Sequence, residues 1–281
     1  MGDFNAQPAP AETNPAQDFA RFCKGLASAL ALANYGLVLM VLITGRQLPG
    51  KAGWPEALLL FTVTLSTLAA LSRQLPMQNA LLAAGIIAGI GTGAHLIGTL
   101  TAIPFGPFSF TENAGPRLFN RVAWLLPFLW VLLVLNSRGV ARLILRPWRK
   151  LRAYGFWLIG LTVVLTVLLE AGFEPFAVGV KKYWLWEPTR LPFTWGGAPL
   201  TNLLGWLVTA LLIMAFAAPA LIDKRARPVS RPPDYHPLVT WLLALVLFAT
   251  GFALDKLWLH AGYCLVLGIA ITLLAVRGAR W

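Results

Sequence analysis

The sequence predicts an all-α integral membrane protein, a polytopic bundle of about eight transmembrane helices. Three observations predict it: low charge, long apolar runs and the arrangement of the basic residues. Of the 281 residues, 58% are hydrophobic and only 12% are charged, whereas soluble globular proteins carry about 25% charged residues. So few charges cannot cover the surface of a soluble protein of this length.

The apolar runs define the individual helices, because a membrane span needs about 20 predominantly apolar residues. Eight segments qualify, and in chain order they are 26–45, 54–72, 79–103, 119–137, 154–176, 200–222, 237–255 and 257–276. The last two lie so close together that one broken hairpin is the alternative, which gives seven helices as the fallback count. Pro127 lies inside the fourth segment and predicts a kink there.

The first 25 residues differ from the rest of the chain. Residues 1–25 are polar and rich in Ala, Pro, Asn and Gln, and they lack the basic start and early apolar core of a signal peptide. We expect a disordered tail, followed by a single transmembrane domain over residues 26–281. Cys23 and Cys264 are too few and too far apart to indicate a disulfide framework or a metal site.

The net charge of +12 is concentrated in alternate loops. Loop 137–153, loop 223–236 and the C-terminus hold most of the Lys and Arg residues. Cytoplasmic loops concentrate these residues, so both termini are predicted to be cytoplasmic. The charge is therefore a topology signal, with anionic membrane lipids as the expected contact and no nucleic-acid partner.

Two loops on the opposite, outer side are longer and rich in Pro, Gly and aromatic residues. They cover about 104–118 and 177–199, and such loops often lie at the membrane interface. The third segment, 79–103, contains five glycines. Glycines in an apolar helix indicate close helix packing, and the strand that a dinucleotide-binding motif requires is missing here.

Two carboxylic acids at the outer end of the fifth segment are the clearest candidates for chemistry. Glu170 and Glu174 lie four residues apart, so they share one helix face. Low polarity and mutual repulsion keep one carboxyl neutral, and a neutral carboxylic acid can donate a proton. The alternative is that Glu174 lies at the interface and Glu170 hydrogen-bonds a neighbouring helix.

Other polar and aromatic residues gather near these acids in the sequence. His95, in the third segment, is either a structural hydrogen-bonding group or a proton carrier. Asn202 either caps the sixth helix or points into the site. Trp184, Trp186 and Trp206 can stabilise a cation or pack an extended apolar ligand. Three scattered histidines and no cysteine pair argue against a metal site.

The segment HLIGTLTAIPFGPFSFTENAGPRL resembles the carotenoid biosynthesis membrane protein family, which includes carotenoid hydratases of bacteria and bacterioruberin-pathway hydratases of archaea. The first signature of the family is an acid, a Gly three residues on, and then Phe-Gly-x-Tyr-x-Tyr. The Phe-Gly pair is Phe105 and Gly106, Phe108 stands at the first tyrosine, and the second is Phe110. His95 stands where the acid is usual.

The second signature follows in the same order along the chain. It is an Asp, then Asp-Pro four residues on, Trp-x-Trp, Gly-x-Pro and Asn-x-x-Gly-Trp. The matching residues here are Glu170, Glu174-Pro175, Trp184-Leu185-Trp186, Gly197-Ala198-Pro199 and Asn202-Leu203-Leu204-Gly205-Trp206. Both acids are Glu rather than Asp.

The resemblance implies a hydratase of a prokaryotic cytoplasmic membrane that adds water to the terminal isoprenoid double bond of an acyclic carotenoid such as lycopene, without a cofactor. Glu170, the deeper acid, is expected to protonate the alkene to a tertiary carbocation, while Glu174 or His95 positions water. The expected substrate-binding residues are Phe105, Gly106, Phe108, Trp184, Trp186, Glu187, Asn202 and Trp206.

Two other functions stay open at this point. A carotenoid cyclase begins with the same protonation and excludes water, so its product keeps the mass of the substrate. A carotenoid- or lipid-binding protein, or a transporter, performs no chemistry, and the absence of a visible internal repeat disfavours the transporter.

Overall fold

The computed structural model describes residues 15–46, 48–49, 53–188, 193–222 and 232–281. Within them, eight helices are long and apolar enough to cross a membrane, which confirms the predicted architecture. They are α1 (Pro15–Thr44), α2 (Trp54–Leu71), α3 (Met77–Thr101), α4 (Leu126–Ile144), α5 (Tyr154–Pro175), α6 (Leu200–Ala217), α7 (His236–Leu254) and α8 (Trp258–Ala279). A turn at residues 255–257 separates α7 from α8, so the count is eight and not seven.

Two helices begin elsewhere than the sequence suggested. Helix α1 begins at Pro15, so residues 15–25 of the expected tail are helical, and residues 1–14 lie outside the described part of the chain. Helix α4 begins at Leu126, which places Pro127 in its first turn. Proline is tolerated there because the N–H it lacks has no partner within the helix. The expected kink at Pro127 is therefore wrong.

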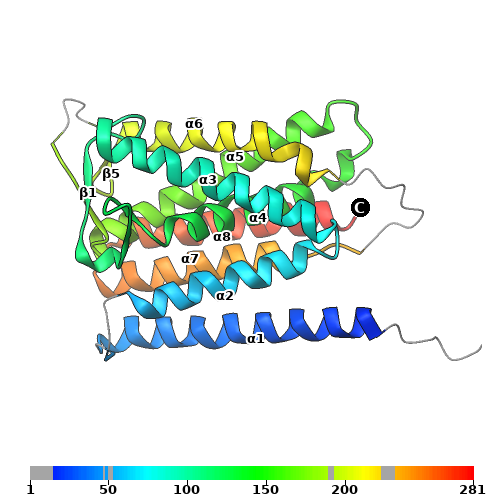
Figure 1. Ribbon diagram of the computed structural model, residues 1–281, viewed down its shortest axis with the longest axis horizontal. Helices are drawn as coiled ribbons and strands as arrows, with labels where there is room; N and C mark the ends of the chain where they lie inside the picture. The colour runs from blue at the N-terminus through cyan, green and yellow to red at the C-terminus, as the bar shows by residue number, and fades with distance from the viewer. Residues whose placement is uncertain (1–14, 47, 50–52, 189–192, 223–231) are drawn as a thin grey trace, which may run out of the picture.

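The helices lie side by side along the long axis, with α1 at the edge of the bundle against α2 (Figure 1). All short strands gather at one end, which we call the aromatic end, formed by residues 102–125, 181–188 and 193–199. The opposite, basic end contains residues 72–76 and 145–153, and α1 begins and α8 ends there (Figure 1). The basic residues expected at 224–231 fall outside the described residues, and the side of the membrane that each end faces stays a prediction.

The aromatic end is organised by six short strands, which are β1 (Phe108–Phe110), β2 (Arg117–Leu118), β3 (Val122–Ala123), β4 (Trp184–Trp186), β5 (Thr194–Trp195) and β6 (Ala198–Pro199). They form the antiparallel pairs β1–β4, β2–β3 and β5–β6. In β1–β4, Phe108 faces Trp186 and Phe110 faces Trp184. Since side chains alternate along a strand, these four aromatic residues lie on one face. The two aromatic loops therefore form one structure.

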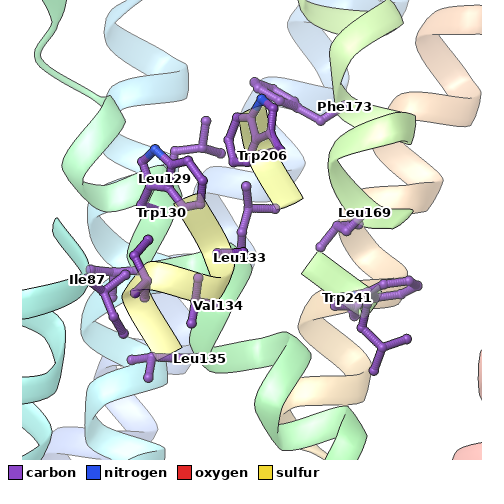
Figure 2. Packing of buried hydrophobic residues seen from close by; sticks show 14 of the residues in the cluster. Ile87, Leu129, Trp130, Leu133, Val134, Leu135, Leu169, Phe173, Trp206 and Trp241 are labelled. Atoms are coloured by element: carbon purple, nitrogen blue, oxygen red, sulfur yellow. The ribbon is translucent and has the colours of Figure 1, made fainter. Parts of the chain in front are cut away.

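Two large aromatic residues pack in the helix core where α3, α4 and α6 meet. Trp130 and Trp206 are fully buried and stack with ring centroids 4.0 Å apart. Figure 2 shows both rings in the core. The close approach depends on Gly91, because a Cβ there would overlap the Trp130 ring. A Cβ at Gly89 would meet nothing within 4 Å. The close packing that the glycines of α3 predicted is therefore confirmed at Gly91 but not at Gly89.

Candidate active site

The two acids of α5 lie inside the protein near the aromatic end. Glu170 is 0% exposed and Glu174 is 1% exposed, so the protein encloses both carboxyl groups. Helix α5 ends at Pro175, and a single π-helical turn, Phe176–Val180, follows it. The two carboxyl groups lie close enough to interact with each other. The fold therefore buries a carboxyl pair one helical turn before the chain leaves the bundle.

Glu174 is held by two indole groups from β4. The Nε1 atoms of Trp184 and Trp186 both donate to its Oε1 atom, at 2.9 and 2.6 Å. Residues two apart on a strand point to the same face, so the Trp-x-Trp spacing directs both indoles to one oxygen. Two N–H donors on one carboxyl stabilise its ionised form.

Glu170 has fewer partners. The Nδ2 atom of Asn202 donates to its Oε1 atom at 3.0 Å, and its buried Oε2 atom has no well-oriented hydrogen-bond partner among the described residues. The N-terminal cap of α6 is Pro199 and not Asn202. Of the two roles considered for Asn202, the structure thus shows the one that points into the site.

His95 lies in an aromatic box on the other side of the site. Its ring is 4.2 Å from that of Phe105 and 5.5 Å from that of Trp206, between centroids. Its Nδ1 atom lies 3.0 Å from the carbonyl oxygen of Gly91 and 3.3 Å from the indole nitrogen of Trp130. Nδ1 must carry a proton to bond the carbonyl and must lack one to accept from the indole, so only one of these bonds forms in a given tautomer.

The Phe-Gly motif shapes the wall of this box. Gly106 has a φ of 103°, a backbone conformation that residues other than glycine rarely adopt. A Cβ at this position would also lie 2.9 Å from Oγ1 of Thr201. The turn lets Thr201 donate to the carbonyl of Phe105 at 3.1 Å and buries the Phe105 ring against His95. Gly106 therefore contributes backbone conformation and no side chain.

A small cavity of about 10 Å³ lies at the centre of these groups. Its walls are His95, Phe105, Phe108, Phe110, Glu174, Trp184, Trp186, Asn202 and Trp206. A cavity of roughly 10–15 Å³ can hold one water molecule. Three polar side chains in the wall can hydrogen-bond that water. We call this space the small cavity.

Eight of the eleven predicted site residues line the small cavity, and Gly106, Glu187 and Glu170 do not. Glu187 is exposed and does not line the small cavity. Glu170 does not line the cavity either, and it hydrogen-bonds Asn202, which does. The sequence did not assign Phe110 and Trp130 to the site, although one lines the cavity and the other stacks on its wall. Among the described residues, no group of three His, Cys, Asp or Glu side chains is placed to hold a metal ion.

Eight membrane-spanning helices around a buried carboxyl pair define an integral membrane protein with an acid site inside the bundle. The sequence model of the family described as "carotenoid biosynthesis protein" matches residues 54–271. This match covers most of the chain and every residue of the acid site. The chain belongs to the carotenoid biosynthesis protein family.

One curated relative is the bisanhydrobacterioruberin hydratase of Haloarcula japonica. The two sequences are 28% identical over 184 residues, which cover 64% of this chain. The same match spans only 58% of the length of the relative. No solved structure matches this chain.

Proposed function

We propose that this protein hydrates the terminal isoprenoid double bond of an acyclic carotenoid. The observation that carries the proposal is the buried carboxyl pair beside an aromatic cavity with room for one water molecule. The family and the hydratase name of the relative support the same class of reaction. The proposed location is the cytoplasmic membrane of a prokaryote, where the apolar substrate dissolves.

The resting proton is assigned to Glu170. Two interacting carboxyls in a site of low polarity share one proton. The two indole donors favour the ionised form on Glu174, whereas Glu170 has one amide donor and a free oxygen to carry the proton. Glu174 is the member that lines the small cavity. Transfer of the proton from Glu170 to Glu174 therefore places it beside the substrate.

The reaction then needs no oxidant or reductant. The Glu174 O–H bond breaks as the proton adds to the CH carbon of the terminal double bond, and the π electrons leave a tertiary carbocation. Water forms the new C–O bond and releases one proton to the carboxyl pair, which restores the starting charge. The net change is the addition of one water molecule.

The walls of the small cavity fit this sequence of steps. The indole of Trp184, which lines this cavity and donates to Glu174, can stabilise a nearby cation. His95 and Asn202 present polar groups that can orient the attacking water. A cyclase has to exclude water from its cation, so a water-sized polar cavity beside the acids favours hydration.

Expression in a host that accumulates lycopene tests the proposal. The wild type is expected to add the mass of one water for each modified end, whereas Glu170→Gln and Glu174→Gln each lower the yield by about 10²–10⁴-fold, the usual contribution of a general acid. Glu187→Gln is the matched control, because this acid is exposed, and it retains full yield. A cyclised product of unchanged mass, or full hydration by both site variants, would contradict the proposal.

A further inference from the structure

A second, larger cavity of about 270 Å³ lies between α1, α2, α4, α5 and α7. Its walls are almost entirely apolar and include Leu129 and Leu133 of α4 on one side and Leu169, Phe173 and Trp241 on the other, as Figure 2 shows. It extends along α7 from His236 to Phe248, and 12 residues of helix span about 18 Å. We call this space the large cavity.

Polar contacts lie at both ends of the large cavity. At the basic end, the Oγ atom of Ser66 lies 2.9 Å from Oγ of Ser28 and 2.9 Å from Nε2 of His236. At the aromatic end, Glu56 lines the cavity and forms an ion pair with Lys181. The cavity thus runs along the bundle between a polar contact at each end.

Tyr183 also lies at the aromatic end of the large cavity. Burial and the neighbouring Glu56 carboxylate raise the pKa of Tyr183 well above its ordinary value, so its phenol stays neutral. The Glu56 carboxylate is already paired with Lys181. Among the described residues, the aromatic end of the cavity therefore presents no unpaired cation to a ligand.

The large cavity opens sideways between α1 and α7. Leu32 of α1 and Val239 of α7 both line it, yet they are 58% and 51% exposed. On the aromatic side of this opening, the Tyr35 hydroxyl donates to the carbonyl of Leu243 at 3.0 Å. On the basic side, Ser66 joins α1 to α7 through the contacts described above. Seven residues separate the two bridges on each helix, which leaves an apolar opening about 10 Å high.

One side chain connects the large cavity to the acid site. Trp184 lines both cavities, and its indole donates to Glu174 at 2.9 Å. Its ring also packs against Phe173, at 5.7 Å between centroids, and Phe173 belongs to the wall of the large cavity. An end group at the aromatic end of the large cavity therefore meets the indole that holds the catalytic carboxyl.

We propose that the large cavity binds the polyene chain of the substrate, which enters from the bilayer between α1 and α7 with its reacting end toward Trp184. The inference rests on the proposed function. An acyclic carotenoid is about as long as the ~30 Å hydrocarbon core of a bilayer, so it exceeds the cavity, and its remaining length extends through the opening into lipid. None of the described residues that line the cavity is Lys or Arg, so a phospholipid phosphate finds no cation there.

Bulky substitutions along this route test the proposal through binding and conversion, measured separately. Ala31→Phe fills the cavity wall and Val239→Trp covers the exposed rim of the opening. Ala33→Phe is the matched control, because Ala33 is on the same helix but exposed and outside the cavity. The readouts are lycopene retained by the purified protein and hydrated product in cells. A melting curve shows that each variant is folded, and Val239→Trp changes no buried position.

The first two variants are expected to retain about tenfold less lycopene and to convert proportionally less, whereas Ala33→Phe behaves as wild type. Each tenfold loss of affinity corresponds to ~1.4 kcal/mol, within the range that overfilling a packed site costs. Wild-type retention and conversion in both cavity variants overturns the route. If the wild type retains lycopene, Ala31→Phe lowers that retention and neither makes hydrated product, the cavity is upheld and the proposed reaction is overturned. Retained phospholipid acyl chains in place of lycopene also overturn the route.

Discussion

Gly91→Ala probes how strictly the site depends on helix packing. A Cβ at residue 91 would lie 2.6 Å from Cδ2 of Trp130 and closer still to two other atoms of the same ring. Carbon atoms pack at about 3.5–4.0 Å, so the indole has to move by about 1 Å. Trp130 is fully buried and stacks on Trp206, so the displacement passes directly to the wall of the small cavity.

The expected cost has two parts. Overpacking a dense core destabilises by about 1–3 kcal/mol, and a 1 Å misplacement of site residues lowers a reaction rate by up to about 10²-fold. The control is Gly89→Ala on the same helix, where the new methyl group meets nothing within 4 Å. Thermal unfolding in detergent and hydrated product per milligram of protein are the two measurements.

The comparison between the two glycine variants decides the outcome. Gly91→Ala is expected to melt below both the wild type and Gly89→Ala and to make much less product. Gly89→Ala should be at least as stable as the wild type, because Ala favours helix over Gly. Equal melting temperatures and equal product in both variants would refute the argument that Gly91 positions the Trp130–Trp206 stack.

Two further predictions concern polar contacts to the two acids, and a third concerns the need for a metal ion. Trp186→Phe removes one of the two donors to Glu174 and keeps an aromatic ring, so hydration yield should fall by about tenfold at near-normal stability; unchanged yield would contradict a role for that bond. Asn202→Leu leaves buried Glu170 without its amide donor and should cost about 1–3 kcal/mol of unfolding free energy, measured by thermal unfolding; equal stability would show that the bond contributes nothing. Membranes treated with a metal chelator should keep their hydration activity, and loss of activity that added divalent ions restore would show that a metal takes part.

The membrane architecture could be predicted from the sequence because it depends on the apolar character of consecutive residues. Eight apolar runs of sufficient length specify eight spans, and the depth of Glu170 follows from its distance along α5. The motif residues near the acids also converge as expected, since helix periodicity and the Trp-x-Trp spacing fix their directions. Local patterns therefore identified most of the small cavity.

The remaining features depend on contacts between distant segments. The β1–β4 pair joins Phe110 to Trp184, and strands this short carry too little alternation to predict a partner. The sequence also did not predict which acid lines the cavity. Its greater depth favoured Glu170, but Glu174 lines the small cavity and Glu170 only hydrogen-bonds Asn202, which does line it. The start of α4 at Leu126 depends on the chain before Pro127 forming β3 and a turn.

The large cavity was not predictable either, because it arises from how loosely one helix packs. Over Phe22–Thr44 helix α1 is strongly apolar, and few of its residues are buried in the protein. Apolar composition does not distinguish a helix face that contacts lipid from one that borders a cavity. Leu32 illustrates the difficulty, because it does both.

The most direct test of the central claim is isotope incorporation during turnover. Membranes containing the protein are incubated with lycopene in water labelled with heavy oxygen, and then in deuterium oxide, and the products are analysed by mass spectrometry. Protonation followed by capture of water predicts one heavy oxygen, and one deuterium on carbon, for each modified end. The Glu174→Gln protein should incorporate neither. A product without the heavy oxygen, or incorporation that persists in the Glu174→Gln protein, would contradict hydration by the buried acid pair.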